Sequence, residues 1–475
     1  MPKVIVIGLD GGSWNYIQKW IDEGKMPAFK KLQTGGTWGV LMSQLPPVTS
    51  PNWKCFSTGL NPAKLGVFWW ENVDVKNRKI FVPNAKSFTG KEIFDYLSEA
   101  GYRVGVVDMP TTYPPHKING IMVSGGPDAM ESGFTYPAAL ENLLKSKFDY
   151  AVLPHNISYM GQGATEVIEE IYRLISVRFQ VAEYLLEQGK FDFFMVAVYL
   201  INVLQHYHWG DEVVFKAWQI IDEGVGRLMA KYPEAKFYFM SDHGTNEIKI
   251  KFNISSWLEE KGYLKLKQNT ATSKLGKLGI TKTRATKWLT TLGLKDFVKK
   301  VVPKNLQQML PDDVGHIQFA GKAESIDWDN SQVIASGQGP LYLLNKDEAF
   351  KEKLIKELEA LEHNGMRIVK KVYKKEEVYS GQFFDLAPDL IVDQAPNTHF
   401  SGSLGGNGVF EAPAHWKGEN ERRGLFLAYG EGIKAGKMDT SILNLAPTIL
   451  NEFGIPKPEQ MDGEVVEFDN DSIIS

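Results

Sequence analysis

The sequence predicts an α/β fold in which a mainly parallel sheet is covered by helices on both faces. Short apolar runs, rich in valine, isoleucine and phenylalanine, indicate buried strands at residues 4–9, 104–107, 193–198 and 237–240. Helical periodicity fills the stretches between them, at residues 14–34, 91–100, 136–146, 164–188 and 212–231. Strands that alternate with helices in this way are typical of parallel sheets, because each crossover helix packs on a face of the sheet.

Polar residues stand directly after two of these strands. The first strand, residues 4–9, ends at Asp10, and the helix expected after it, residues 14–34, closes on two glycines. Asp242 and His243 follow the last of the four strands. In parallel sheets, ligands gather beyond the carboxyl ends of the strands, so this placement is the first indication of a functional site.

Residues 260–335 break the alternation of strands and helices. They are rich in lysine, threonine and leucine and contain helix-like pieces. We interpret them as an inserted cap within an α/β catalytic core made of residues 1–259 and 336–475. After the cap, we expect a helix and then a strand within 345–373, and a helix at 443–453.

Composition narrows the class of protein. The 475 residues are 43% hydrophobic and 23% charged, which is ordinary for a folded chain. A net charge of -4 gives no reason to expect a nucleic acid polymer or an acidic membrane as partner. The single cysteine, Cys55, excludes an internal disulfide and a cysteine-based zinc site. No segment approaches the ~20 apolar residues of a membrane span, so we expect a cytoplasmic protein.

Several segments carry residue types suited to phosphoryl chemistry. These are residues 8–12, 46–53, 57–62, 202–206, 241–244, 414–416 and 424–430. Thr49 is an alcohol, which can ionise against a metal ion and attack phosphorus. Asn52, three residues later, can donate a hydrogen bond to a phosphate oxygen.

Aspartate and histidine side chains in these segments are suited to bind divalent metals such as zinc. Asp10, Asp242 and His243 can meet at the strand ends, and Asn202 and His206 share one face if their segment is helical. Two metal ions about 4 Å apart can hold both the attacking and the leaving oxygen. Taken singly, each pattern is more often a turn, a cap or a structural histidine. Their joint occurrence at strand ends is what favours a site.

At this level of detail the chain resembles the type I phosphodiesterase/nucleotide pyrophosphatase family of the alkaline phosphatase superfamily. The resemblance runs nearly end to end and is weakest in residues 260–335. Its motifs are Thr49-Ser50-Pro51-Asn52-Trp53 and Thr58-Gly59-Leu60-Asn61-Pro62. Residues 110–115, 387–392 and 446–450 also fit the prokaryotic branch of the family. The resemblance implies an alkaline-phosphatase-like core.

The resemblance also implies site residues and cofactors. One divalent metal ion would be bound by Asp10, Thr49, Asp242 and His243. A second would be bound by His206, His415 and the residue at position 202. Thr49 would attack phosphorus and form a phosphothreonine, while Asn52 would help to hold the phosphoryl oxygens. Zinc is the expected metal, with manganese as the alternative.

One departure from the family pattern concerns position 202. The family has aspartate there, whereas this chain has Asn202. Two imidazoles and a neutral amide should bind a dication less tightly than a set that contains a carboxylate. Three outcomes stay open: a weaker but working site, substitution by another carboxylate, or a site with one metal or none. We expect Asn202 to lower metal affinity without abolishing catalysis.

The leading functional hypothesis is hydrolysis of a phosphodiester or pyrophosphate bond in a small phosphoester substrate such as a nucleotide. Phosphomonoester or phosphonate hydrolysis on the same core is the enzymatic alternative. A ligand-binding protein with a degenerate metal site is the non-enzymatic alternative. The sequence leaves the natural substrate and the oligomeric state open.

Overall fold

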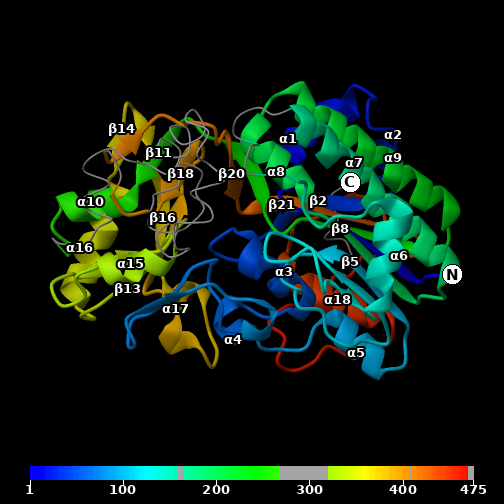
Figure 1. Cartoon of the computed structure of the whole chain (residues 1–475), viewed down its shortest axis with the longest axis horizontal. Helices are drawn as coiled ribbons and strands as arrows, with labels where there is room; N and C mark the ends of the chain where they lie inside the picture. Colours follow the sequence, from blue (N-terminus) through cyan, green and yellow to red (C-terminus); the bar gives the residue numbers. More distant parts are fainter. Residues whose placement is uncertain (156, 158–159, 161–164, 268–318, 406–407, 469–475) are drawn as a thin grey trace, which may run out of the picture.

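Figure 1 shows the computed structural model, which has two lobes and describes residues 1–155, 157, 160, 165–267, 319–405 and 408–468. The larger lobe is built on a ten-stranded sheet. Its strands are β1 (Val4–Leu9), β2 (Thr37–Met42), β5 (Val104–Met109), β6 (Gly120–Ser124), β7 (Thr135–Tyr136), β8 (Phe193–Val198), β9 (Lys236–Met240), β21 (Arg423–Tyr429), β22 (Gly436–Lys437) and β23 (Thr440–Ser441). Their order is β22-β2-β21-β9-β1-β8-β5-β6-β7, and β23 pairs with β2. The central run from β9 to β6 is parallel, which confirms the predicted mainly parallel sheet.

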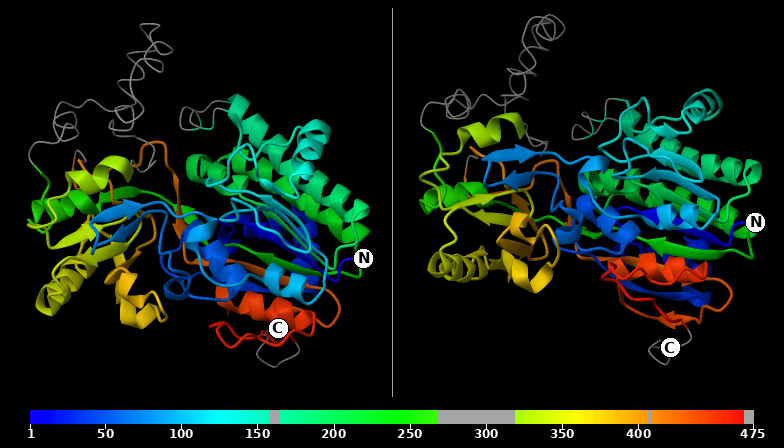
Figure 2. Two further views of the ribbon diagram at one scale, coloured as in Figure 1. Left: turned by 60° about the horizontal axis from the view of Figure 1, so that its bottom comes forward. Right: turned by 90° about the horizontal axis from the view of Figure 1, so that it is seen from below.

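The first strand shows why helices cover both faces. Ile5, Ile7 and Leu9 of β1 lie in one hydrophobic core, whereas Val4 and Val6 lie in the other. The first core is closed by α1 (Trp14–Asp22), α2 (Pro27–Gly35), α6 (Ala139–Phe148), α7 (Thr165–Gln188), α8 (Leu200–His208) and α9 (Glu212–Lys231). The second is closed by α3 (Thr49–Thr58), α5 (Ile93–Glu99) and α18 (Leu445–Glu452). Figure 2 shows α18, in red, and the green helices on opposite sides of the sheet.

The single helix predicted over residues 14–34 is wrong, because the segment forms α1 and α2. Gly24 has φ +74°, a left-handed conformation that stops α1. Pro27 then occupies the first turn of α2, where its missing N–H costs nothing. The break lets both helices pack on the same core, at an angle that one straight helix could not adopt.

The smaller lobe has its own hydrophobic core and several small sheets. The four-stranded sheet has the order β12-β13-β17-β16 and the three-stranded sheet the order β18-β11-β19. In addition, β14 (Glu362–His363) pairs with β15 (Met366–Arg367), and β3 (Asn72–Asp74) pairs with β4 (Lys79–Phe81). The elements are β11 (Ile250–Asn253), α10 (Ile254–Glu260), β12 (Val333–Ala335), β13 (Pro340–Leu343), α16 (Glu348–Glu359), β16 (Val369–Lys374), β17 (Leu390–Gln394), β18 (Thr398–Ser401) and β19 (Phe410–Glu411). Figure 1 shows this lobe beside the carboxyl-end side of the large sheet.

The predicted cap, residues 260–335, lies only partly within the described residues, because 268–318 fall outside them. The core of the smaller lobe contains Phe252 and Ile254, which precede the predicted cap, and Leu341 and Phe400, which follow it. The boundaries of the cap therefore stay a prediction, while the lobe itself draws on residues from both sides of them.

Parallel strands bring the functional segments to one edge of the large sheet. Asp10 follows β1 and Asp242 comes two residues after β9, while α8 begins two residues after β8. β1 pairs in register with both neighbours, since Gly8 lies opposite Ala197 and Met240. The strands therefore end at the same level, and the residues after them share one edge.

Candidate metal centre

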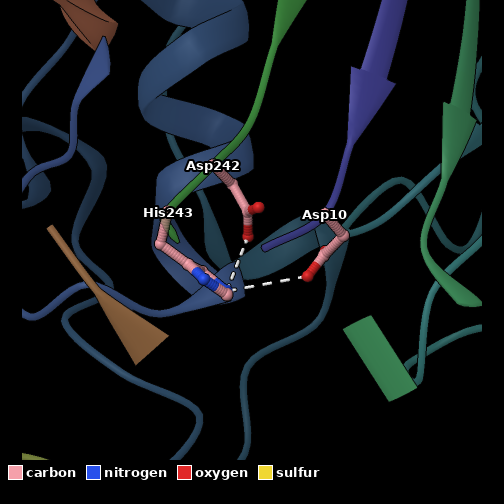
Figure 3. Close-up of side chains that lie close together, drawn as sticks. All are labelled: Asp10, Asp242 and His243. Atoms are coloured by element: carbon pink, nitrogen blue, oxygen red, sulfur yellow. Dashed lines mark ion pairs between the residues drawn. The ribbon is translucent and has the colours of Figure 1, made fainter. Parts of the chain in front are cut away.

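Asp10, Asp242 and His243 form a fully buried cluster at this edge. One ligand atom from each lies within 4.8 Å of the other two. Nε2 of His243 is 3.2 Å from Oδ2 of Asp242 and 3.6 Å from Oδ1 of Asp10. Figure 3 shows the two carboxylates and the imidazole directed at a common point. Two carboxylates and one imidazole are a donor set suited to zinc or manganese.

The hydrogen bonds around the cluster leave two of the converging carboxylate oxygens without a partner. Nδ1 of His243 donates to the Gly244 carbonyl at 2.9 Å, so Nε2 presents its lone pair. One carboxylate oxygen of Asp10 accepts from Nε1 of Trp53 at 2.8 Å, and one of Asp242 accepts from the Gly11 N–H at 3.2 Å. The other oxygens, Oδ1 of Asp10 and Oδ2 of Asp242, are buried without a hydrogen-bond partner among the described residues. Because unpaired buried oxygens are costly, the residues fit a divalent cation.

Burial also perturbs the protonation of the cluster. It raises the pKa of Asp242 from 3.8 to about 7, although the Gly11 N–H opposes this shift. Burial and the nearby charge of Asp242 raise the pKa of Asp10 well above its usual value. Burial lowers the pKa of His243, which favours the neutral imidazole. Burial therefore makes protons compete with a metal more strongly on the carboxylates and less strongly on the histidine.

We expect Zn²⁺ to raise the melting temperature of the chain more at pH 8 than at pH 5.5. At pH 5.5 most Asp242 carboxyls are protonated, because their pKa is about 7, so an ion must displace the proton. Affinity should fall roughly tenfold for each pH unit and each proton displaced. Thermal denaturation with and without Zn²⁺ at the two pH values measures this. Equal increments at both values would contradict it.

Thr49 is the first residue of α3, and its side chain reaches the same cluster. Its Oγ1 is 3.3 Å from Nε2 of His243, and the hydroxyl slightly opposes the rise in the pKa of Asp242 that burial causes. The side chain is only 4% exposed. The position at a helix N-terminus adds partial positive charge where an anionic phosphoryl group would sit. The structure thus brings together four of the residues predicted for the site.

Asn52, one turn further along α3, uses its side chain on the loop before the helix. Its Nδ2 donates to the carbonyls of Gln44, Pro46 and Val48 at 3.2, 3.0 and 3.0 Å, and its Oδ1 accepts from the Gln44 N–H at 2.8 Å. These bonds fix the conformation of residues 44–48, which lead to Thr49. The role predicted for Asn52 toward a phosphoryl oxygen stays a prediction.

Trp53 supports the cluster from behind. Its ring is fully buried and its Nε1 donates to Asp10. We expect Trp53→Phe to weaken metal binding about 10- to 100-fold, the usual effect of losing a hydrogen bond to a metal ligand. Titration of metal-stripped protein with Zn²⁺ measures it. Phe56, a neighbouring ring of the same core, offers a control as Phe56→Leu, which should leave the zinc affinity unchanged.

The other predicted metal ligands are less closely gathered. Asn202 and His206 both lie on α8 and are buried, as the helical spacing predicts. The Asn202 side chain hydrogen-bonds Asp10, which lowers the pKa of that carboxyl against the larger effect of burial. Nδ1 of His206 donates to the Gly418 carbonyl at 2.7 Å. His415 is exposed, on the loop between β19 and β20 (Gly418–Glu421).

The sequence analysis did not identify Glu419 and His399, which lie near His206. Glu419 is fully buried, and its carboxylate accepts from Nδ1 of His399 and from Nε2 of Gln338. Burial lowers the pKa of His206 to about 4, and the charge of Glu419 is the main opposing effect. The segment around Glu419 reads as a charged surface loop, because a lysine, two glutamates and two arginines stand within residues 417–423. In the structure this segment pairs with β10 (Gly244–Glu247), and Glu419 is buried.

No helix in the described ranges is long and apolar enough to cross a membrane.

The family model described as type I phosphodiesterase / nucleotide pyrophosphatase matches residues 4–421. A comparison with curated proteins finds no match. Among solved structures, the chain is similar to a phosphonoacetate hydrolase from Sinorhizobium meliloti 1021, in complexes with phosphonoformate and with phosphonoacetate. Each comparison has a TM-score of 0.57 and 16% identity, and covers 90% of both chains, which supports the fold alone.

Proposed function

This chain belongs to the type I phosphodiesterase/nucleotide pyrophosphatase family, and we propose that it hydrolyses phosphodiester or pyrophosphate bonds with Thr49 as nucleophile. Membership makes it a phosphoester hydrolase of the alkaline phosphatase superfamily. The finer proposal concerns the bond, the intermediate and the metals. The observation that carries it is the Thr49 hydroxyl, 3.3 Å from Nε2 of His243 and beside the two unpartnered carboxylate oxygens.

The reaction follows from what surrounds Thr49. A cation bound by Asp10, Asp242 and His243 would supply positive charge for the attacking and phosphoryl oxygens. The threonine proton must leave before attack. Nε2 of His243, 3.3 Å from the hydroxyl, cannot take it while it binds the cation, so the acceptor beside the hydroxyl is the Asp242 carboxylate. The threonine oxygen then forms a bond to phosphorus, while the leaving oxygen departs with its electron pair. Water attacks the phosphothreonine in the second half, and Thr49 regains its proton.

A buried ion pair favours a diester over a monoester substrate. A phosphomonoester dianion needs additional positive charge, often from lysine or arginine near the nucleophile. Lys54 is the only basic residue beside Thr49 in sequence. Its ammonium is buried and paired with Glu92 at 2.8 Å, so it is already neutralised. A phosphonate substrate remains the second candidate, because the solved structures similar to this chain are of a phosphonoacetate hydrolase.

A comparison of three substrates tests the proposal. We expect Zn²⁺- or Mn²⁺-dependent hydrolysis of bis-p-nitrophenyl phosphate that exceeds hydrolysis of p-nitrophenyl phosphate and of phosphonoacetate. Greater turnover of phosphonoacetate would favour the second candidate. No turnover of any of them, with metal bound, would favour a ligand-binding protein instead. We also propose that the site binds two zinc ions and that the protein is cytoplasmic.

A further inference from the structure

The predicted second metal site lacks a carboxylate in this chain. Its three members would be Asn202, His206 and His415. The Asn202 side chain is neutral and is engaged with Asp10, and its Oδ1 lies 3.5 Å from the Thr245 hydroxyl. His415 is exposed to solvent. His206 is therefore the only buried imidazole of this set, and a dication there would have no negative ligand.

The structure places a different carboxylate beside His206. The backbone at the start of β20 makes two hydrogen bonds with that histidine, because Nδ1 of His206 donates to the Gly418 carbonyl and the N–H of Lys417, just before the strand, donates to the His206 carbonyl. Glu419 is the next residue along this strand, and its side chain is fully buried. With Nδ1 occupied, Nε2 of His206 is the atom left to bind a metal.

The charge around Glu419 is not balanced by a lysine or an arginine. Among the described residues, the ion pair of its carboxylate is with His399, and its other contacts are the amide of Gln338 and the Asn420 N–H at 2.8 Å. A histidine is likewise the ion-pair partner of Asp10 and of Asp242, so these three buried carboxylates are paired with imidazoles and not with lysine or arginine among the described residues. Buried carboxylates with so little positive charge beside them are suited to bind a cation.

We propose that Glu419 replaces the carboxylate missing at position 202 and binds a second divalent cation, such as zinc, together with His206 and His399. One carboxylate and two imidazoles form a common set for catalytic zinc. His399 lies on β18 of the smaller lobe, whereas His206 lies on α8, so this cation would link the two lobes. This inference deepens the proposed function and rests on it, because it concerns the second metal of that site.

The donor atoms of Glu419, His206 and His399 do not all meet in the structure. Within the described part of the chain, the donor groups that meet within 4.8 Å are Asp10, Asp242 and His243, and Glu92, Asp95 and His116. Binding would therefore have to draw the His206 ring toward the Glu419–His399 pair. Trp416 stands beside both imidazoles, with ring centroids 3.9 Å from His206 and 6.4 Å from His399. Its ring would have to move with them.

The test measures metal binding separately from activity. Full-length protein is stripped with a chelator, titrated with Zn²⁺ against a chromophoric chelator, and analysed for ions per chain by mass spectrometry. We expect two ions in the wild type and one tightly bound ion in Glu419→Gln, with the second bound about 100-fold more weakly. His399→Ala should weaken the same ion. The double variant Glu419→Gln/Asn202→Asp should regain it, because the carboxylate returns at the family position.

Two further variants make the result specific. Glu411→Gln removes a carboxylate that pairs with Lys251 at 3.0 Å on β19, and should leave both ions in place. His415→Ala distinguishes the donor sets, since we expect it to keep the second ion. Loss of that ion in His415→Ala but not in His399→Ala would overturn the inference, as would a wild type with one ion. If Glu419→Gln also loses the first ion, the test rests on His399→Ala. That variant should keep the first ion and bind the second more weakly, and unchanged binding of the second ion would overturn the inference.

The outcome is separable from that of the proposed function. If the wild type hydrolyses phosphoesters and Glu419→Gln still binds two ions at wild-type affinity, this inference fails and the proposed function stands. If the variants lose the second ion as expected but the wild type turns over no phosphoester, the metal site stands and the proposed function fails.

Discussion

Replacement of Thr49 by alanine should lower phosphodiester turnover by at least about 10³-fold while the metal site stays loaded. The hydroxyl is the group that would form the bond to phosphorus, so its removal eliminates the covalent route. Its loss leaves Asp10, Asp242 and His243 in place, and these three form the cluster. Turnover of bis-p-nitrophenyl phosphate and ions per chain, measured on the same sample, test both halves of the expectation.

Thr49→Ser is the matched control, because it keeps the hydroxyl and removes only a methyl group. It should retain measurable turnover and form a phosphoserine that acid quenching can trap. Activity in Thr49→Ala within tenfold of the wild type would show that water, not Thr49, attacks phosphorus. Loss of the metal in Thr49→Ala would instead show that the threonine is needed mainly as a ligand.

Replacement of Asp242 by asparagine should remove the first metal ion and lower activity at limiting zinc by more than about 100-fold. The substitution takes one of two negative charges from the cluster. Zn²⁺ at about 100 times its dissociation constant contributes about 2.7 kcal/mol to the stability of a folded protein. This increment should disappear in the variant, as measured by denaturation with and without Zn²⁺.

In metal-free protein, Asp242→Asn should not lower the stability of the folded chain. The folded pKa of Asp242 is about 7 against a usual 3.8, so the metal-free folded chain binds a proton more tightly than the unfolded chain. Its stability therefore falls as pH rises from about 4 to about 7. Asp242→Asn removes this loss, and metal-free variant should be at least as stable as metal-free wild type at pH 8. A clear decrease there would mean that Asp242 acts as a structural anchor and is not held for a cation.

Much of the large lobe could be predicted from the sequence. The four predicted strands appear as β1, β5, β8 and β9, because each is an apolar run bounded by polar or glycine residues. The smaller lobe was harder to predict. Its strands are short, and it joins residues near 252 to residues near 400 in one core. Such contacts between distant segments leave no periodic pattern in the sequence.

The sequence by itself predicted the donor cluster of Asp10, Asp242 and His243, which the structure gathers. Asp10 and Asp242 follow apolar strands that become parallel neighbours of one sheet, so the strand pattern already implied their meeting. Thr49 was identified from the resemblance of residues 49–53 to the motif of the family. These are local properties, and local patterns are what a single sequence records.

The residues that we propose for the second half of the site came only from the tertiary structure. Asn202 stands where the family has a ligand carboxylate, and its buried side chain lowers the pKa of Asp10 against the larger effect of burial. Glu419 looked like a surface residue, yet the pairing of β20 with β10 buries it next to His206. Burial of a charged side chain depends on which distant strands cover it, and that information lies in the fold and not in the neighbouring residues.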